Sequence, residues 1–133
     1  MRIAAHRLAT ISIIGEQFCF VADSDLSHFN PCAKLSGHAF DRWNEIKEQH
    51  RTIGDVRGLG LMIGIELVKE DGHTPDEAAF PALGTYALEH NMLILPCGPD
   101  SNIIRFIPPL NVSTEELDLG IDTLADAIAV YES

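Results

Sequence analysis

The sequence predicts an α/β (α+β) fold, in which a small mixed or antiparallel sheet of about three to four strands is covered by helices. Three observations support this fold class. Apolar residues recur at helical spacing in several segments, they alternate with a period of two in another, and a turn-rich link separates two short apolar runs. With 133 residues, of which 46% are hydrophobic and 22% charged, the chain is expected to form a single domain over residues 1–133.

The N-terminal part of the chain has two segments of unclear pattern followed by a regular one. Ile3–Glu16 carries apolar residues on most faces and few helix breakers, so we expect a helix there. Phe18–Cys32 mixes apolar and polar stretches, which indicates either a short strand and turn or local disorder. From Leu35 to about His50, apolar residues recur at intervals of three and four, which predicts an amphipathic helix.

The middle of the chain predicts a strand and then a helix. Apolar residues alternate from Leu59 to Val68, which predicts a strand with one apolar face. Its opposite face carries two glycines, Gly60 and Gly64, which have no side chain. Thr74-Pro75-Asp76-Glu77 fits a capping box, although Pro81 moves the expected start of the main helix nearer to Phe80. Asn91 stands where a left-handed C-terminal cap is needed.

The C-terminal part predicts a strand pair and a last helix. Met92–Pro96 and Asn102–Ile107 are short apolar runs joined by a turn-rich link, which favours antiparallel pairing. Ser113-Thr114-Glu115-Glu116 is a second capping box, and Val112 can pack on Leu117 as a hydrophobic staple. The apolar face expected for the last helix consists of Leu117, Ile121, Leu124, Ile128 and Tyr131.

Charge and cysteine usage restrict the partners and the compartment. A net charge of −11 makes nucleic acid and anionic membranes poor partners. The chain has an odd number of cysteines and no CxxC pair; they are Cys19, Cys32 and Cys97. This favours a reducing compartment and argues against a disulfide framework. A zinc site is not expected either. Met1–Ala22 loosely resembles a signal peptide, but Glu16 interrupts its apolar run, and we expect a cytoplasmic protein.

Arg105 is the strongest candidate for a binding residue. It lies inside the apolar run Ile103–Ile107, and its guanidinium keeps its charge and therefore needs an anion. The fork of N–H groups suits a carboxylate ligand. The alternatives are an ion pair with an acid such as Glu66, or an edge strand with the side chain in water.

Two other patterns suggest chemistry more weakly. Gly58, Gly60 and Gly64 have GxGxxxG spacing, but they fall within the strand pattern, where phosphate binding is not expected, so a structural role is favoured. Cys97 could pair with one of six scattered histidines as a nucleophile, which would make the chain a hydrolase, but no nucleophile signature surrounds it. We predict no catalytic, cofactor-binding or metal-binding residue in this chain.

The segment Ile53–Leu67 closely resembles the strand that enters the C-terminal small domain of class III pyridoxal-phosphate aminotransferases, typified by 4-aminobutyrate aminotransferase. Leu93–Gly98 and Asn102–Leu110 are similar to the next two strands of that family, and Thr114–Gly120 resembles the start of its final helix. The resemblance is good over residues 34–130 and poor over 1–33. It implies the C-terminal domain fold of fold-type I aminotransferases.

The resemblance also implies a function. In the family, the arginine matched by Arg105 binds the substrate carboxylate, in an enzyme that moves an amino group from an amino acid, often of the omega type, to a 2-oxo acid. Intact members form an aldimine between pyridoxal phosphate and a lysine of the large domain, and none of Lys34, Lys47 and Lys69 lies in a similar motif. We therefore expect the chain alone to bind no cofactor and to be inactive. The family also forms dimers, so we expect self-association or pairing with a large-domain chain; the alternative is a non-catalytic binding or dimerisation module.

Overall fold

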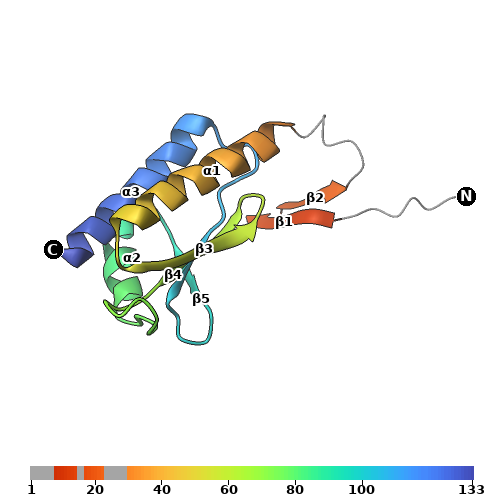
Figure 1. Ribbon diagram of the computed structural model, residues 1–133. Helices are drawn as coiled ribbons and strands as arrows, with labels where there is room; N and C mark the ends of the chain where they lie inside the picture. The colour runs from red at the N-terminus through yellow and green to blue at the C-terminus, as the bar shows by residue number, and fades with distance from the viewer. Residues whose placement is uncertain (1–7, 15–16, 23–29) are drawn as a thin grey trace, which may run out of the picture.

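The computed structural model describes residues 8–14, 17–22 and 30–133 and confirms the predicted fold class. The main body is a four-stranded antiparallel sheet with three helices (Figure 1). In chain order the elements are β1 (Leu8–Ile14), β2 (Gln17–Ala22), α1 (Asn30–Gln49), β3 (Ile53–Leu59), β4 (Met62–Leu67), α2 (Ala79–Glu89), β5 (Leu95–Cys97), β6 (Ile103–Phe106) and α3 (Thr114–Glu132).

The helix predicted over Ile3–Glu16 is wrong where the structure describes it. Leu8–Ile14 is a strand that pairs antiparallel with Gln17–Ala22 in a separate two-stranded sheet. The segment contains Thr10 and three isoleucines, and such β-branched residues favour strands over helices. The other residues of that predicted helix, 3–7 and 15–16, lie outside the described part. For Phe18–Cys32, the strand alternative agrees with β2, and residues 23–29 are not described. Residues 30–32 are already helical, so α1 begins five residues before the predicted start at Leu35.

The single strand predicted over Leu59–Val68 is interrupted by a turn in the structure, because Leu59 ends β3 and only Met62–Leu67 forms β4. Strands β3 and β4 pair antiparallel, and Gly60 and Leu61 form the two-residue turn between them. Gly60 has a φ of 61°, a conformation that glycine adopts without steric cost and that two-residue hairpin turns require at this position. The predicted alternation still holds along β4, where Ile63, Ile65 and Leu67 are buried.

The order of strands in the main sheet is β3-β4-β6-β5, and every neighbouring pair is antiparallel. The predicted antiparallel pairing of the last two runs is therefore confirmed as β5 with β6. Strand β6 lies between β4 and β5, so it is not an edge strand. This position places Arg105 in the interior of the sheet.

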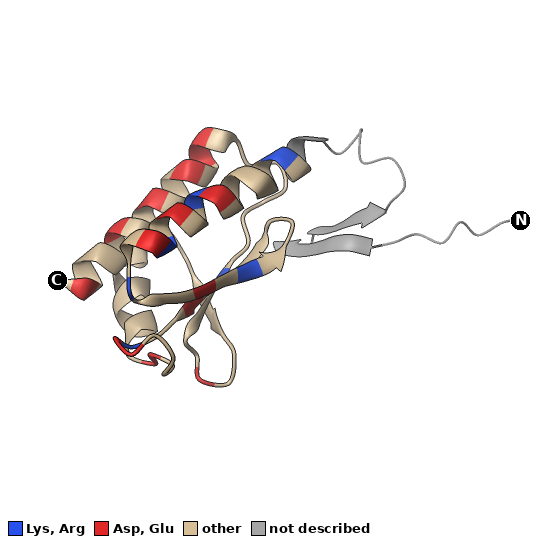
Figure 2. Ribbon diagram, in the orientation of Figure 1, with Lys and Arg blue, Asp and Glu red and all other residues tan. Residues whose placement is uncertain are grey.

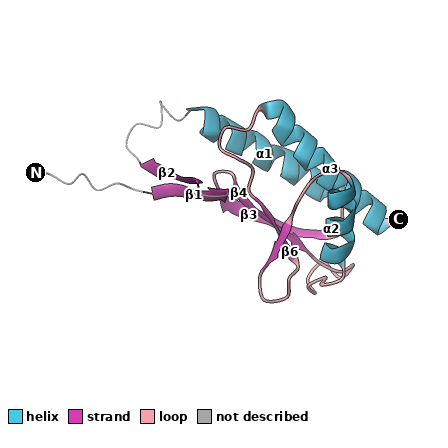
Figure 3. Ribbon diagram, turned by 180° about the vertical axis from the view of Figure 1, so that it is seen from behind, coloured by secondary structure: helices cyan, strands magenta, loops and turns pink. Residues whose placement is uncertain are grey.

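The helices cover only one face of the main sheet. Helices α1 and α3 lie side by side over that face, and α2 packs against α3 (Figures 1 and 3). Trp43 of α1 is fully buried and meets the ring of Phe106 edge to face, with 5.7 Å between the ring centroids. The predicted helical faces are confirmed in this core, whose largest members are Trp43, Leu61, Ile63, Ile65, Leu67, Leu83, Ile104, Leu117, Ile121, Leu124 and Ile128.

The two predicted capping boxes have different outcomes. Ser113 caps α3 as expected: its hydroxyl accepts a hydrogen bond from the backbone N–H of Glu116, whose carboxylate accepts one from the N–H of Ser113. Thr74–Glu77 is not a helix start, because α2 begins at Ala79 and has no side-chain cap. Thr74 instead donates its hydroxyl to Asp71. At the other end of α2, Asn91 has the predicted left-handed conformation, with a φ of 60°.

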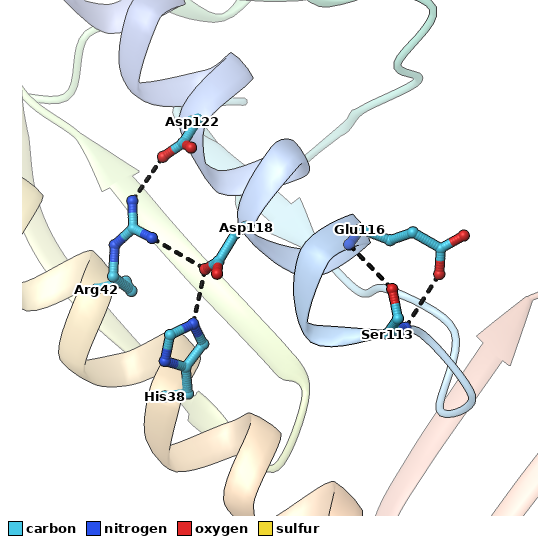
Figure 4. A network of polar contacts seen from close by, with 6 residues as sticks. All are labelled: His38, Arg42, Ser113, Glu116, Asp118 and Asp122. Atoms are coloured by element: carbon cyan, nitrogen blue, oxygen red, sulfur yellow. Dashed lines mark hydrogen bonds and ion pairs between the residues drawn. The ribbon is translucent and has the colours of Figure 1, made fainter.

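A polar network joins α1 to α3 (Figure 4). Asp118 accepts hydrogen bonds from His38 Nε2 at 2.7 Å and from Arg42 Nη1 at 2.9 Å, and Asp122 accepts one from Arg42 Nη2 at 2.5 Å. These two aspartates of α3 therefore bind side chains of α1 across the helix interface. The remaining acidic residues of α1 and α3 lie along the outward helix surfaces (Figure 2).

Candidate functional site

The face of the main sheet that the helices leave uncovered, called here the open face, contains the candidate site. Because side chains alternate along a strand, residues flanking the buried ones on β3, β4, β6 and β5 all point to this side. A cavity of about 1080 Å³ includes residues of this face from all four strands, and its wall continues over the link before β5 and onto helix α3. Its size is in the upper range of small-molecule sites.

The cavity wall is largely apolar. Met62, Leu93, Leu95 and Leu119 line it while remaining exposed, and Leu93 has 80% of its surface accessible. Several exposed apolar side chains around one cavity are typical of a ligand or protein contact site. The open face therefore combines apolar surface with a small number of polar side chains, which is the usual composition of a binding site.

Arg105 lies on β6, directly opposite Gly64 of β4 on one side and Leu95 of β5 on the other. Its side chain is exposed and lines the cavity. No residue in the described part of the chain forms an ion pair or a side-chain hydrogen bond with it. Glu66 is therefore not its partner. The second alternative is right that the side chain of Arg105 lies in water, although β6 is not an edge strand.

Glu66 instead pairs with Arg57, a residue that the sequence did not single out. Arg57 Nη1 donates to Glu66 Oε2 and also to Asp55 Oδ2, the latter at 2.9 Å. These hydrogen bonds, first that to Glu66, raise the pKa of Arg57, and the hydrogen bond from Arg57 lowers the pKa of Asp55. The signal that could have found this group was the hairpin turn at Gly60, which places Arg57 near Glu66.

The glycines of the GxGxxxG pattern serve packing and turns. A Cβ on Gly58 would lie 2.0 Å from the carbonyl oxygen of Met62, so no side chain fits there. A Cβ on Gly64 would lie 3.3 Å from Ile103 Cγ2. Neither glycine stands between a strand and a helix, as phosphate binding requires.

Cys97 lines the same cavity and is half-buried, with a free thiol. His90 is the histidine that shares the cavity with it, and its Nδ1 donates to the backbone carbonyl of Tyr86 at 2.8 Å. Within the residues described, no histidine hydrogen-bonds to the thiol. The geometry thus supplies no base for Cys97, and no observation favours the hydrolase alternative.

The described residues offer neither a metal site nor a membrane-spanning helix. They contain no group of three His, Cys, Asp or Glu side chains arranged to hold a metal ion. Among them there is also no helix with the length and apolar character needed to cross a bilayer.

Comparison with known proteins assigns the family. The sequence profile of the family described as "Aminotransferase class-III" matches residues 9–128. This chain therefore belongs to the class III aminotransferases, whose intact enzymes use pyridoxal phosphate, in agreement with the resemblance found in the sequence.

Individual relatives include enzymes with different reactions. A leucine/methionine racemase from Thermococcus litoralis is 39% identical over 99 residues, which are 74% of this chain and 22% of the racemase. A 4-aminobutyrate aminotransferase from Mycobacterium leprae is 42% identical over 85 residues, 64% of this chain and 19% of that enzyme. A 5-aminovalerate aminotransferase from Pseudomonas putida is 36% identical over 85 residues. The chain thus spans only 19% to 22% of the length of these curated relatives.

Solved structures agree on the fold. A phospholyase from Arthrobacter, in complex with phosphoethanolamine, superposes with a TM-score of 0.71 at 27% identity, covering 78% of this chain and 26% of that one. N-acetylornithine aminotransferase from Stenotrophomonas maltophilia gives a TM-score of 0.65 at 30% identity, covering 84% of this chain and 28% of that one.

The residues of the cavity do not fit the anchoring chemistry of pyridoxal phosphate. An aldimine needs a lysine amine, and the described residues that line the cavity include no lysine. The three lysines lie elsewhere: Lys34 is exposed on α1, Lys47 pairs with Asp55 at 3.5 Å, and Lys69 lies exposed after β4. The cationic side chains of the cavity are Arg57 and Arg105, and a guanidinium forms no aldimine with the cofactor.

Proposed function

We propose that this chain is the C-terminal segment of a pyridoxal-phosphate-dependent aminotransferase that moves an amino group from an omega-type amino acid to a 2-oxo acid. The family assignment supports the enzyme class, and the relatives named for 4-aminobutyrate and 5-aminovalerate support the donor type. Arg105 holds the substrate carboxylate.

The observation that carries the proposal is the unpaired guanidinium in the cavity. Arg105 is exposed toward a space large enough for a small molecule, and no acid of the described chain neutralises it. The apolar residues beside it, such as Leu95 and Met62, suit the methylene groups of a short amino acid. A carboxylate bound in two parallel hydrogen bonds would satisfy the arginine.

The isolated chain lacks the cofactor lysine, so in this proposal it is inactive alone. The test is to add pyridoxal phosphate to the purified chain, reduce with borohydride and search each lysine peptide for the cofactor by mass spectrometry. We expect no specific aldimine band and no stoichiometric labelling of any lysine. Stoichiometric labelling of Lys34, Lys47 or Lys69 would contradict this part of the proposal.

The catalytic part of the proposal needs a complementing chain. A large domain of a class III aminotransferase, produced separately and loaded with pyridoxal phosphate, is mixed with this chain and supplied with 4-aminobutyrate and a 2-oxo acid. We expect amino transfer only in the mixture, and a raised KM with Arg105→Gln. Because one relative is a racemase, the assay also follows the optical activity of leucine. Racemisation without amino transfer would show that the proposed reaction is wrong and that the enzyme is a racemase.

The alternative is a non-catalytic binding or dimerisation module, and the apolar open face favours it specifically. Leu59, Met62, Leu93 and Leu95 leave 40% or more of their surface accessible on this face. Such a surface suits self-association or a large-domain chain. Sedimentation of the chain alone and with the large domain separates the two candidates: assembly without any reaction in the mixture supports the module.

A further inference from the structure

Two arginines lie in one row across the open face. Arg57 of β3 is directly opposite Gly64 of β4, and Gly64 is directly opposite Arg105 of β6. Directly opposed residues in a sheet point to the same side, so both guanidinium groups extend over this face. With strands about 4.8 Å apart, their Cα atoms are about 10 Å from each other. Gly64 between them has no side chain, and Ile103 Cγ2 lies 3.3 Å from the place that a Cβ of Gly64 would take.

Glu66 is within reach of both arginines. It lies two residues beyond Gly64 on β4, and therefore on the same face, where it is directly opposite Asp55 of β3 and Ile103 of β6. It is thus diagonal to Arg57 on one side and to Arg105 on the other. Diagonal neighbours lie about 7–8 Å apart, a gap that long side chains span. The strand geometry alone does not decide which arginine Glu66 binds.

In the structure, Glu66 binds Arg57 and not Arg105. Glu66 binds Arg57 Nη1, and Asp55 binds the same nitrogen at 2.9 Å. Asp55 also forms an ion pair with Lys47 of α1, with 3.5 Å between Oδ1 and Nζ. This chain of alternating charges holds Arg57 over β3 and β4, whereas Arg105 has no charged partner among the described residues.

We propose that Arg57 is a positioning residue: it binds Glu66 and so keeps the guanidinium of Arg105 open to a carboxylate from solution. Without Arg57, Arg105 is the arginine of the cavity that remains in diagonal contact range of Glu66. An internal ion pair then competes with the ligand, and the apparent affinity falls with the fraction of Arg105 that is free. The inference rests on the proposed function only for the identity of the ligand.

The first measurement uses no ligand. Phenylglyoxal modifies arginines and reacts more slowly with a guanidinium held by a carboxylate, since the reaction needs the deprotonated form. The purified 133-residue chain is compared with Arg57→Gln, Glu66→Gln and the double variant. Mass spectrometry follows the modification rate of the peptide that contains Arg105, and thermal unfolding checks that each variant is folded.

In the wild-type chain, we expect Arg105 to react faster than Arg57. Arg57→Gln should slow the reaction of Arg105 by about two- to fivefold, the range that an exposed ion pair supports. The double variant should restore the wild-type rate, and Glu66→Gln alone should leave the rate of Arg105 unchanged. A loss of structure would not be repaired by Glu66→Gln, so the restoration distinguishes positioning from a general structural effect.

An unchanged rate at Arg105 in Arg57→Gln, or a slowed rate that the double variant fails to restore, would overturn the proposal. Arg57→Lys supplies an independent variant should Arg57→Gln not fold. Lysine keeps the charge but makes one point contact in place of a fork, so we expect a smaller slowing that Glu66→Gln again removes.

The second measurement adds pyruvate to the same proteins and follows the backbone amides of Gly64 and Leu95 by NMR. The apparent Kd should rise in Arg57→Gln and return in the double variant, in step with the modification rates. If the modification rates follow the expected order but no variant binds pyruvate, Arg57 still positions Glu66, and the proposed carboxylate site at Arg105 is wrong. The two failures are therefore distinguishable.

Discussion

The two faces of the main sheet have opposite character. On the covered face, Ile63, Ile65, Ile104 and Phe106 are at most 4% exposed and pack beneath the helices. On the open face, the residues that alternate with them include exposed apolar side chains, Gly64, two arginines and the acids Asp55 and Glu66. One set of strands thus provides the core and, one residue further along, the candidate site.

This difference separates stability from function. Burial of apolar surface is the main favourable term in folding, so the covered face supplies the stability of the domain. The open face leaves apolar surface in water, which contributes nothing to folding and suits a partner or a ligand. Substitutions on the two faces should therefore have different consequences, and the following predictions are ordered by the size of the expected effect.

The largest effect is expected from Trp43→Ala on the covered face. Removal of this buried ring should lower the free energy of unfolding by about 3–5 kcal/mol. The indole N–H has no hydrogen-bond partner in the described part of the chain, so the loss reports packing rather than a broken bond. Urea titration measures the effect. Leu93→Ala on the open face is the control, and we expect a change within about 0.5 kcal/mol; equal losses would contradict the division between the faces.

The next effect is expected from Gly58→Ala in the hairpin. Its Cβ would clash with the carbonyl oxygen of Met62 at 2.0 Å, and its φ of 155° is rare for other residues. We expect a loss of about 1–3 kcal/mol, from strain of this kind. Gly37→Ala in α1 is the matched control, because nothing lies within 4 Å of the added Cβ. That substitution should stabilise the chain by about 0.5–1 kcal/mol. Thermal unfolding should therefore show a lower melting temperature for Gly58→Ala and a higher one for Gly37→Ala.

A smaller, pH-dependent effect is expected from Glu132→Gln at the end of α3. The carboxylate accepts hydrogen bonds from His50 Nδ1 and from the backbone N–H of Thr52, both at 2.8 Å. Burial would raise the pKa of Glu132, but these hydrogen bonds outweigh it, and the pKa is lower than usual. At pH 7 the variant should lose about 0.5–1 kcal/mol.

The sign of the pH effect follows from the lowered pKa. The stabilisation is fully present above the ordinary value of 4.5 and is lost as pH falls through the pKa of the folded state. The difference in the free energy of unfolding between wild type and Glu132→Gln should therefore shrink as the pH falls below about 5. Denaturant titrations at a series of pH values measure this. A difference that grows on acidification would show that the pKa is raised instead.

The sequence predicted elements well where one periodic pattern dominated. The helix from Leu35 to His50 and the face of α3 followed from apolar spacing, and Ser113 with Glu116 identified the start of α3. Leu8–Ile14 was predicted wrongly because an apolar run without clear period does not distinguish a helix from a strand. The turn at Gly60 was missed because alternation continued through it.

The candidate site was predicted only in part, for the same reason. Arg105 could be identified from its apolar neighbours in the sequence, without knowing which strands lie beside it. The partner of Glu66 depended on the register between β3 and β4, which the missed turn sets. Arg57 therefore remained unnoticed, and the unpaired state of Arg105 could not be foreseen.

Carboxylate binding by Arg105 is tested most directly by titrating the chain with pyruvate and following the backbone amides of Gly64 and Leu95. We expect saturable shifts with pyruvate, none with its uncharged methyl ester, and a Kd at least about tenfold weaker in Arg105→Gln, as loss of a charge-assisted hydrogen bond implies. The thermal stability of that variant should stay at the wild-type value, because Arg105 lies on the open face. Equal pyruvate binding by wild type and Arg105→Gln would contradict carboxylate binding at Arg105.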